Sequence, residues 1–280
     1  DFMNEHCKHV ILHHNHIKTV FIVEDMRTGK HYMMKEILVL QSLHKLPAAN
    51  EHDVLEKLHS KNTHDDNRSH PGTAYLGIEP TPDIFHELVK VSMVFPLYEM
   101  DLFNMIDYHT KIFKVEGFKT ATIVLYLAQM LEMLRKMKKS DVVHRDIKPE
   151  NICVNSRGNL VLVDFEMAVD ADEDGQFTDP SMTVGTVYYI APESFESRTY
   201  SSESDLWAVG VVACELFSAT LPWDIRSGMS SASVLKLLQE AKAEKPPMMD
   251  DELWGFLESK IFQPKAKRSS VEDWYERRAK

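Results

Sequence analysis

The chain contains 280 residues, of which 44% are apolar and 27% are charged, and its formal net charge is −11. This length and apolar content are sufficient for one large core or for two joined lobes. The acidic balance argues against nonspecific binding to nucleic acid, which requires Lys and Arg to neutralise phosphates. No apolar run approaches the roughly 18 residues of a membrane-spanning helix, so we expect no transmembrane segment.

The three cysteines and the first residue of the chain do not identify a cellular compartment. Cys7, Cys153 and Cys214 are too few and too scattered to indicate a disulfide framework or a zinc site. The chain begins at Asp1 without a signal-like segment, and we expect it to be a processed or trimmed form without targeting information.

The N-terminal region is expected to consist of strands. Residues 19–24 are largely β-branched or aromatic, residues 27–30 have the composition of a turn, and residues 31–37 resume an extended pattern. These segments predict a β-hairpin that carries Lys35 near its end.

A helix and a further strand follow the hairpin. Residues 50–59 have apolar side chains at helical spacing after a candidate N-cap, Asn50. Residues 60–72 are rich in His, Asp, Asn and Ser and predict a polar loop. Residues 88–97 predict another strand.

The remainder of the chain is expected to be mainly helical. Residues 120–139 show a strong amphipathic pattern, and residues 206–217 are apolar on almost all sides. The second segment therefore predicts a helix buried in the middle of a helical lobe. Methionines such as Met133 and Met137, at helical spacing, are interpreted as core residues.

The most informative segment is Val-His-Arg-Asp-Ile-Lys-Pro-Glu-Asn at residues 143–151, followed 13 positions later by Asp164. Phosphoryl transfer to a hydroxyl needs a carboxylate to orient it and accept its proton, a cation on the phosphate, and oxygen ligands for magnesium. Asp146 and Lys148 provide the first two roles, and Asn151 and Asp164 provide the ligands. The pattern resembles the catalytic loop and the metal-binding motif of the protein kinases.

The resemblance extends over nearly the whole chain and implies an α+β fold with two lobes. We expect a single protein-kinase-like domain over residues 1–280. A small, β-rich N-lobe is expected in residues 1–95, a hinge in residues 96–99, and a larger, mainly helical C-lobe in residues 100–280.

The resemblance also implies a site for ATP and Mg²⁺, with Mn²⁺ as an alternative. Lys35 matches the lysine that holds the α and β phosphates, and Glu51 is its expected partner in preference to Glu56. The expected catalytic set is Asp146, Lys148, Lys35 and Glu51. Asn151 and Asp164 are the expected metal ligands.

The adenine pocket follows from the same comparison. Its expected residues, besides Lys35, are Val20, Met33, Phe95, Pro96, Tyr98 and Cys153. Phe95 matches the gatekeeper, and the Tyr98 N–H is the expected hinge donor. Met33 replaces a smaller residue and should crowd the pocket, whereas Cys153 is smaller than the usual floor residue and should return that volume.

Other residues indicate which side chain of a substrate accepts the phosphoryl group and how the activity is regulated. Lys148 and Thr186 match the residues that serine/threonine kinases have at these positions, so Ser or Thr is the expected acceptor of the phosphoryl group. Arg145 is the type of residue that pairs with a phosphorylated activation loop. The expected phosphosite falls at Met182, between Ser181 and Thr183.

Two structural contacts are also implied by the resemblance. Arg268 is the expected ion-pair partner of Glu193, which closes the activation segment. Asp205, at the start of the buried helix, matches the acid that supports the catalytic loop from below.

The glycine-rich loop of the family has no counterpart in this sequence. Its three glycines should stand where the chain has His13, Asn15 and Lys18, and the first glycine of the chain is Gly29. Glycines there allow backbone N–H groups to surround the phosphates. Residues 11–18 are expected to be helical or an irregular loop, with Lys18 either on phosphate or exposed on the rim.

Glu166 stands where the family has glycine after Asp164-Phe165. If the backbone needs a positive φ at this position, Glu should cost about 1–3 kcal/mol. Its carboxylate should either bind a cation or repel the γ-phosphate.

A helix in the first residues would place His9, His13 and His16 on one face. Three imidazoles at that spacing are a candidate zinc site. No carboxylate or cysteine stands at a suitable spacing beside them, so a surface cluster is the preferred interpretation.

The chain resembles the With-No-Gly-loop kinases secreted by coccidian parasites such as Toxoplasma, a group that includes a bradyzoite pseudokinase. The resemblance lies in the absence of the loop glycines from a chain that retains Lys35, Asp146, Asn151 and Asp164. This resemblance implies secretion into the parasitophorous vacuole and peripheral association with vacuolar proteins or membranes. The cytoplasm is the alternative location. Two functions are compatible with the sequence: a serine/threonine kinase acting on a protein substrate, or a pseudokinase with weak or no nucleotide binding that scaffolds or regulates a partner protein.

Overall fold

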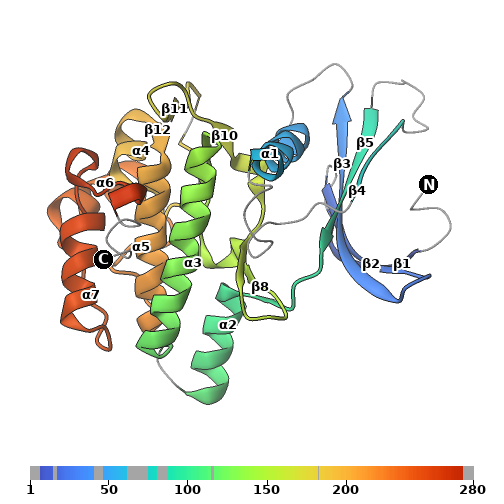
Figure 1. Ribbon diagram of the computed structural model, residues 1–280. Coiled ribbons are helices and arrows are strands. Elements are labelled where there is room, and N and C mark those ends of the chain that lie inside the picture. Colours follow the sequence, from blue (N-terminus) through green and yellow to red (C-terminus); the bar gives the residue numbers. More distant parts are fainter. Residues whose placement is uncertain are drawn as a thin grey trace.

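The structure is a computed structural model that describes residues 7–14, 18–40, 47–61, 75–80, 88–114, 117–181 and 183–273. A β-rich lobe and a helical lobe lie side by side, as the α+β prediction required (Figure 1).

Five antiparallel strands form the β-rich N-lobe, in the spatial order β1-β2-β3-β5-β4. Their bounds are Cys7–His14 (β1), Lys18–Asp25 (β2), Lys30–Leu40 (β3), Tyr75–Pro80 (β4) and Leu88–Pro96 (β5). The predicted hairpin is β2–β3, and its turn is closed by hydrogen bonds from Thr28 N and Gly29 N to Asp25 O. Gly29 has φ +68°, a conformation that favours glycine.

Strand register determines which side chains of the N-lobe share a face. Val20 lies opposite Lys35, and Lys18 lies opposite Ile37. Because residues two apart on a strand point to the same side, Lys18 and Lys35 lie on one face of the sheet.

The helical alternative for residues 11–18 is wrong in the part that the structure describes. β1 runs to His14 and pairs with β2, with a register irregularity between Ile11 and His13, and β2 begins at Lys18. His9 and His13 therefore lie on a strand, and the helix that would have placed them on one face is absent from this described segment. His16 lies outside the described residues. Pairing along the edge of the sheet overrode the helical spacing of the histidines.

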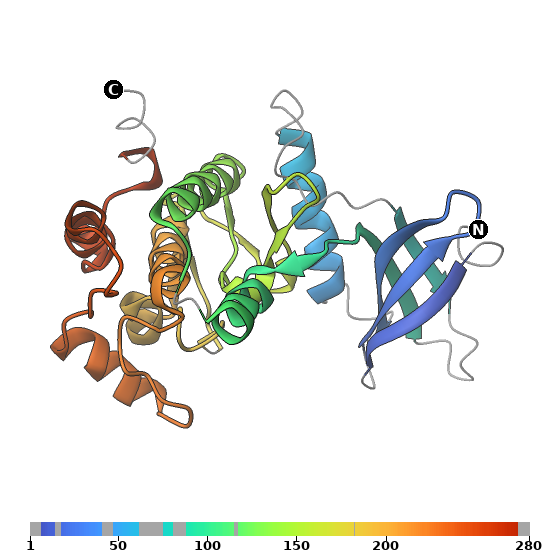
Figure 2. The ribbon, with the colours of Figure 1, turned by 90° about the horizontal axis from the view of Figure 1, so that it is seen from below.

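Helix α1, Pro47–Lys61, lies between the sheet and the helical lobe (Figures 1 and 2). It begins before Asn50, so the predicted cap is wrong: the Asn50 side chain instead donates to Ala168 O at 2.5 Å. The buried face of α1 carries Glu51, Val54 and Leu55. Most of the predicted polar loop at residues 60–72 lies outside the described residues.

The C-lobe contains the predicted long helices and several short elements. α3 spans Thr120–Lys139, as predicted, and α5 spans Ser202–Ser218, four residues longer at its start than the apolar segment indicates. The Ser204 side chain accepts the N–H of Ser201 at 2.8 Å, which stabilises this earlier start of the helix. The other helices are α2 (Leu102–Tyr108), α4 (Pro192–Ser197), α6 (Ser231–Glu240) and α7 (Asp251–Phe256), with shorter turns η1 (His109–Phe113), η2 (Pro149–Asn151), η3 (Phe165–Met167), η4 (Leu257–Ile261) and η5 (Lys265–Lys267).

Three small sheets carry the loops of the C-lobe. They are β6-β8-β9 (Met100–Asp101, Ile152–Val154, Leu160–Leu162), β7-β10 (Val142–Val143, Val169–Asp170) and β11-β12 (Gln176–Thr178, Thr199–Ser201). The residues that follow these strands include Asp146 and Asp164, so the small sheets position the predicted catalytic groups.

The main core extends through the C-lobe and reaches α1 and β5. Leu206 and Trp207 of α5 are buried, with Trp207 stacked on Trp223 at 5.1 Å between ring centroids. Met133 and Met137 are also buried, as predicted for core residues. No described helix is both long and apolar enough to span a membrane.

Candidate active site

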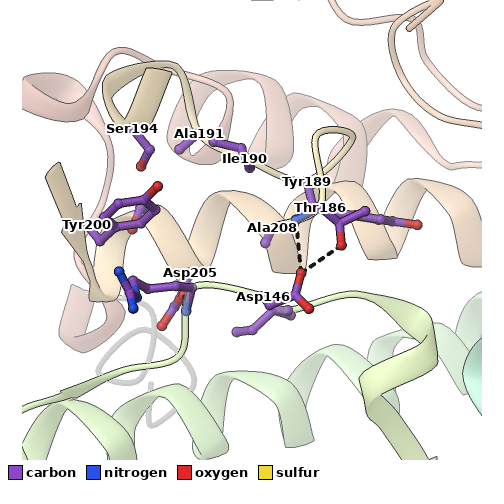
Figure 3. Close-up of a pocket in the computed structure, with 12 residues that line it drawn as sticks. Asp146, Thr186, Tyr189, Ile190, Ala191, Ser194, Tyr200, Asp205 and Ala208 are labelled. Carbon is purple, nitrogen blue, oxygen red and sulfur yellow. Dashed lines mark hydrogen bonds between the residues drawn. The ribbon is translucent and has the colours of Figure 1, made fainter. Parts of the chain in front are cut away.

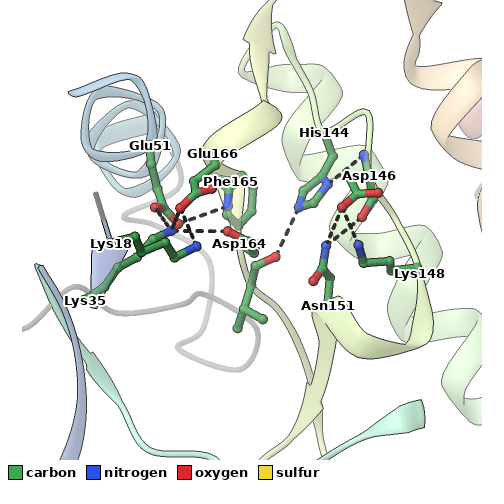
Figure 4. Close-up of polar contacts among 11 residues, drawn as sticks. Lys18, Lys35, Glu51, His144, Asp146, Lys148, Asn151, Asp164, Phe165 and Glu166 are labelled. Atoms are coloured by element: carbon green, nitrogen blue, oxygen red, sulfur yellow. Dashed lines mark hydrogen bonds and ion pairs between the residues drawn. The ribbon is translucent and has the colours of Figure 1, made fainter. Parts of the chain in front are cut away.

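Lys35 lies at the centre of a charged cluster between the lobes. Its Nζ is 2.6 Å from Glu51 Oε2 and 3.2 Å from Asp164 Oδ1, and it also contacts Glu166 (Figure 4). Glu56 is exposed on α1, so the choice of Glu51 as partner agrees with the geometry. The cluster thus joins residues that are distant in sequence: Lys35 comes from β3, Glu51 from α1, and Asp164 and Glu166 from η3 and the residue before it.

Electrostatics favour the charged forms of Lys35 and Asp164. Burial alone would lower the pKa of Lys35, but the carboxylates of Glu51, Asp164 and Glu166 outweigh burial and raise that pKa. Burial alone would raise the pKa of Asp164, but Lys35 and Lys18 outweigh burial and lower it. Near neutral pH the cluster therefore presents a cation for phosphate beside an anion for a metal ion.

The contacts of Phe165 fix the backbone next to Asp164. Phe165 is buried, its N–H donates to Glu51 Oε1 at 3.1 Å, and its ring meets His144 edge-on at 4.8 Å. Asp164 adopts φ +63°. Glu166 lies in η3 and does not have a positive φ, so the expected strain at Glu166 is absent.

The catalytic loop holds Asp146 through several donors. Lys148 Nζ donates to Oδ2 at 2.7 Å, and both the N–H and the hydroxyl of Thr186 donate to Oδ1, at 2.9 and 2.7 Å. Asn151 Nδ2 donates to the Asp146 carbonyl at 2.9 Å. Burial alone would raise the pKa of Asp146, but the bonds from Lys148 and Thr186 lower it. Asp146 is therefore an anion with both oxygens oriented.

The loop is supported from below by Asp205, as the resemblance implies. Its two carboxylate oxygens accept the N–H groups of His144 and Arg145 at 2.8 and 3.0 Å. Asp146, Thr186 and Asp205 line a small pocket between this loop, the activation segment and α5 (Figure 3).

His144 is held as a neutral ring in this loop. Asp146 N–H donates to Nδ1 at 3.3 Å, which assigns the proton to Nε2, 3.2 Å from Val163 O. Burial lowers the pKa of His144, outweighing the carboxylates of Asp164 and Asp146. A second proton on Nδ1 would face the Asp146 N–H, which is itself a donor, so the folded chain favours the neutral imidazole over the imidazolium.

Acidification is therefore expected to destabilise the chain through His144. Because its pKa is lower in the folded chain than the ordinary 6.5, the unfolded chain binds the extra proton first as pH falls. The contribution of neutral His144 to the free energy of unfolding is fully present above about pH 6.5 and is lost as the pH falls below that value. His144→Phe, which keeps the ring contact with Phe165, should show a smaller difference in thermal unfolding midpoint between about pH 7.5 and about pH 5.5 than the unaltered chain. Equal differences would contradict this assignment.

Arg145 is paired with an acidic side chain of the activation segment. Its Nη1 lies 2.9 Å from Asp179 Oδ2, its Nε donates to Met167 O, and its guanidinium lies over the rings of Phe177 and Tyr200. The sequence indicated a phosphorylated residue as the partner of Arg145, and an aspartate has that position here. Met182 lies outside the described residues.

Glu193 and Arg268 form the expected ion pair. The two bonds are 2.6 Å from Nη1 to Oε1 and 3.0 Å from Nη2 to Oε2, and the Arg268 side chain is fully buried. This pair fixes α4, and with it the end of the activation segment, to the C-terminal part of the lobe.

The residues expected to surround adenine come from both lobes. Met33 lies opposite Phe95 across β3 and β5, and Val20 is on the adjacent strand β2. The chain leaves the sheet at Pro96. Tyr98 and Cys153 line a hollow of about 490 Å³ beside Asp101 and α2, while the other predicted pocket residues do not line it.

Cys153 is a neutral thiol in this setting. Burial and the nearby Asp101 raise the pKa of Cys153 to about 12.

The donor set fits magnesium and a nucleotide phosphate. Asp164 offers an anionic oxygen, and the two bonds from Asn151 Nδ2 to Asp146 orient the Asn151 amide. Carboxylate and amide oxygens are the ligands that Mg²⁺ prefers. Oxygens of Glu51, Asp164 and Glu166 lie within 4.8 Å of one another, but Lys35 already contacts all three.

Three contacts of the site were not anticipated from the sequence. Thr186 bonds to Asp146, Asp179 bonds to Arg145, and Lys18 lies 2.7 Å from Glu166. Glu166 was recognised as unusual, but the pairing of Lys18 with it joins positions 148 residues apart. No local pattern in the sequence indicates such a pair.

Comparison with known proteins agrees with this geometry. The chain matches the protein kinase domain family over residues 16–278. It is 30% identical over 209 residues to human serine/threonine-protein kinase 32C, which covers 68% of this chain and 42% of that protein. It is 38% identical over 98 residues to the probable serine/threonine-protein kinase pknA2 of Bifidobacterium longum, covering 35% of this chain and 13% of that protein. It is 30% identical over 152 residues to ribosomal protein S6 kinase alpha-6 of Danio rerio, covering 54% of this chain and 20% of that protein.

The chain thus spans less than half the length of these relatives. The family match nevertheless includes nearly all of both lobes, and within them the two segments that carry Asp146 and Asp164. This chain belongs to the protein kinase family.

Proposed function

We propose that this chain is an ATP- and magnesium-dependent protein serine/threonine kinase that binds its nucleotide without a glycine-rich loop. The observation that carries the proposal is the alignment of Lys35 with both Glu51 and Asp164, at 2.6 and 3.2 Å. The buried Phe165 holds that alignment. The names of the relatives support Ser or Thr as the acceptor.

Each charged residue has a separate role in the proposed reaction. Asp146 orients the acceptor hydroxyl and takes its proton, and Lys148 stabilises negative charge beside Asp146. Lys35 binds phosphate, while Asn151 and Asp164 would hold the metal ion. Magnesium ATP, when bound, supplies the phosphoryl group and neutralises its charge. Thr186 keeps the Asp146 carboxylate pointed at the acceptor position.

A pseudokinase that scaffolds or regulates a partner protein is the second candidate. The observation in its favour is Glu166, whose carboxylate contacts Lys35 and Lys18, the cations nearest to the expected phosphates. If no ligand displaces that carboxylate, nucleotide binding would be weak or absent.

We propose, on the resemblance to the With-No-Gly-loop kinases, that the chain is secreted into a parasitophorous vacuole and associates peripherally with vacuolar proteins or membranes. The cytoplasm is the alternative. The tagged protein, located by immunoelectron microscopy in its source cell, should appear in the vacuole; an exclusively cytoplasmic signal would contradict the proposal.

The activity is tested by transfer of the labelled γ-phosphate of ATP to a generic protein substrate with magnesium. Label is expected on Ser and Thr, and chelation of magnesium should abolish it. Asp164→Asn should lower the rate by about 100-fold or more, since it weakens a metal ligand at the reacting phosphate.

Asp53→Asn, the same change at an exposed position of α1, is the matched control and should leave the rate unchanged. A thermal shift with nucleotide separates the two candidates. Absence of both transfer and shift would reject the kinase and leave the scaffold.

A further inference from the structure

Lys18 and Lys35 are joined by one carboxylate oxygen. Glu166 Oε1 lies 2.7 Å from Lys18 Nζ and also contacts Lys35 Nζ (Figure 4). The Lys18 side chain is 26% exposed and the Glu166 side chain 17% exposed, so the contact is partly accessible to solvent rather than enclosed in the core. Two ammonium groups thus converge on a single anionic oxygen.

The backbone explains why Lys18 reaches this point. Lys18 pairs with Ile37 and Val20 pairs with Lys35, so the two lysines are diagonal neighbours on the same face of β2 and β3. Lys18 also stands where the family's last loop glycine is expected. A side-chain ammonium therefore lies where a backbone N–H donor would normally approach the phosphates.

The two positive charges indicate that an anion occupies the position between Lys18 and Lys35. Ammonium groups that approach each other repel unless an anion lies between them. A non-bridging phosphate oxygen is an acceptor of the same kind as a carboxylate oxygen, with N–H···O distances of about 2.7–2.9 Å. The ion pairs with Lys18 and Lys35 hold the Glu166 carboxylate at this position, and its backbone in η3 does not have a positive φ.

We propose that Lys18 is a phosphate-binding residue of the nucleotide site, and that Glu166 Oε1 marks the place that a nucleotide phosphate oxygen takes between Lys18 and Lys35. The inference rests on the proposed nucleotide-binding function. Phosphate entry releases Glu166 from both ammonium groups. Lys18 then provides the contact that the absent loop glycines provide elsewhere in the family.

The first test is the dissociation constant for ATP, ADP and adenosine, measured by calorimetry on the full chain at constant magnesium. Lys18→Met should weaken ATP and ADP binding roughly 10- to 100-fold, which is the effect of losing one charged hydrogen bond, and leave adenosine binding unchanged. Lys18→Arg should retain most of the affinity. Lys30→Met, at the opposite end of the β2–β3 hairpin, is the charge-matched control and should bind all three ligands like the unaltered chain. ATP affinity that is unchanged in Lys18→Met would overturn the inference.

The second test separates a phosphate ligand from a residue that merely neutralises Glu166. Glu166→Gln should strengthen ATP binding, because a competing anion is removed. Adding Lys18→Met to that variant should still weaken ATP binding roughly 10-fold or more. If Lys18→Met has no effect in the Glu166→Gln background, Lys18 only balances the carboxylate and the inference fails.

The two proposals fail in different ways. ATP binding that depends on Lys18, without any phosphate transfer, would reject the proposed kinase activity and keep the phosphate site. Absence of ATP binding by the unaltered chain would reject both.

Discussion

Asp146→Asn is expected to lower the rate of phosphate transfer by about 10²- to 10⁴-fold, the usual contribution of a positioned general base. Asparagine has nearly the same shape and keeps one oxygen for the bonds from Thr186, but its amide cannot take the proton of the acceptor hydroxyl. The loss should therefore appear in kcat at saturating ATP, with little change in the KM for ATP. Steady-state transfer to a protein substrate measures both quantities.

Asp141→Asn is a matched control for this variant. Asp141 is an exposed residue five positions earlier with φ +54°, a conformation that asparagine also tolerates, so its replacement should not change kcat. Equal thermal unfolding midpoints for all three proteins would show that the effect is chemical. Full activity of Asp146→Asn would contradict the assignment of the base and with it the proposed mechanism.

Arg268→Met is expected to destabilise the chain by about 3–5 kcal/mol, the cost of leaving a buried carboxylate without its partner. Arg268 is the fully buried member of the pair with Glu193 and also donates to the carbonyls of Ile261, Gln263 and Glu203. Methionine fills much of the same volume but replaces none of these bonds. The free energy of unfolding in urea measures the effect.

A second variant separates charge from packing at this pair. Arg268→Met combined with Glu193→Gln removes the uncompensated carboxylate, so the double variant should be more stable than Arg268→Met alone. Arg268→Lys keeps the charge but not the two parallel bonds and should be intermediate. A loss below about 1 kcal/mol for Arg268→Met would indicate that the pair contributes no more than a surface ion pair.

Where one local pattern was sufficient, the sequence predicted the structure well. The apolar periodicity of residues 120–139 predicted α3 with its observed bounds, and the segment at 206–217 predicted the buried part of α5. In both helices, burial of an apolar surface acts in the same direction as local helical preference. The preference for Glu51 over Glu56 also agrees with the structure, because only Glu51 lies on the buried face of α1.

Elements at the edges of the fold were predicted less well. β4, Tyr75–Pro80, was not anticipated, and β1 was expected to be a helix or an irregular loop. Both are edge strands, and their backbone hydrogen bonds come entirely from a neighbouring strand. Their own residues therefore carry little information about the conformation they adopt.

The sequence by itself determined which chemical groups this protein has: carboxylates at Asp146 and Asp164, cations at Lys35 and Lys148, an amide at Asn151, and no glycine before Gly29. Tertiary structure alone decided how the unusual groups are used. It paired Glu166 with Lys18 and Lys35, and Asp179 with Arg145. The physical reason is that an ionised side chain in a cleft takes whichever opposite charge the fold brings near it, and that neighbour can lie more than a hundred residues away in the chain.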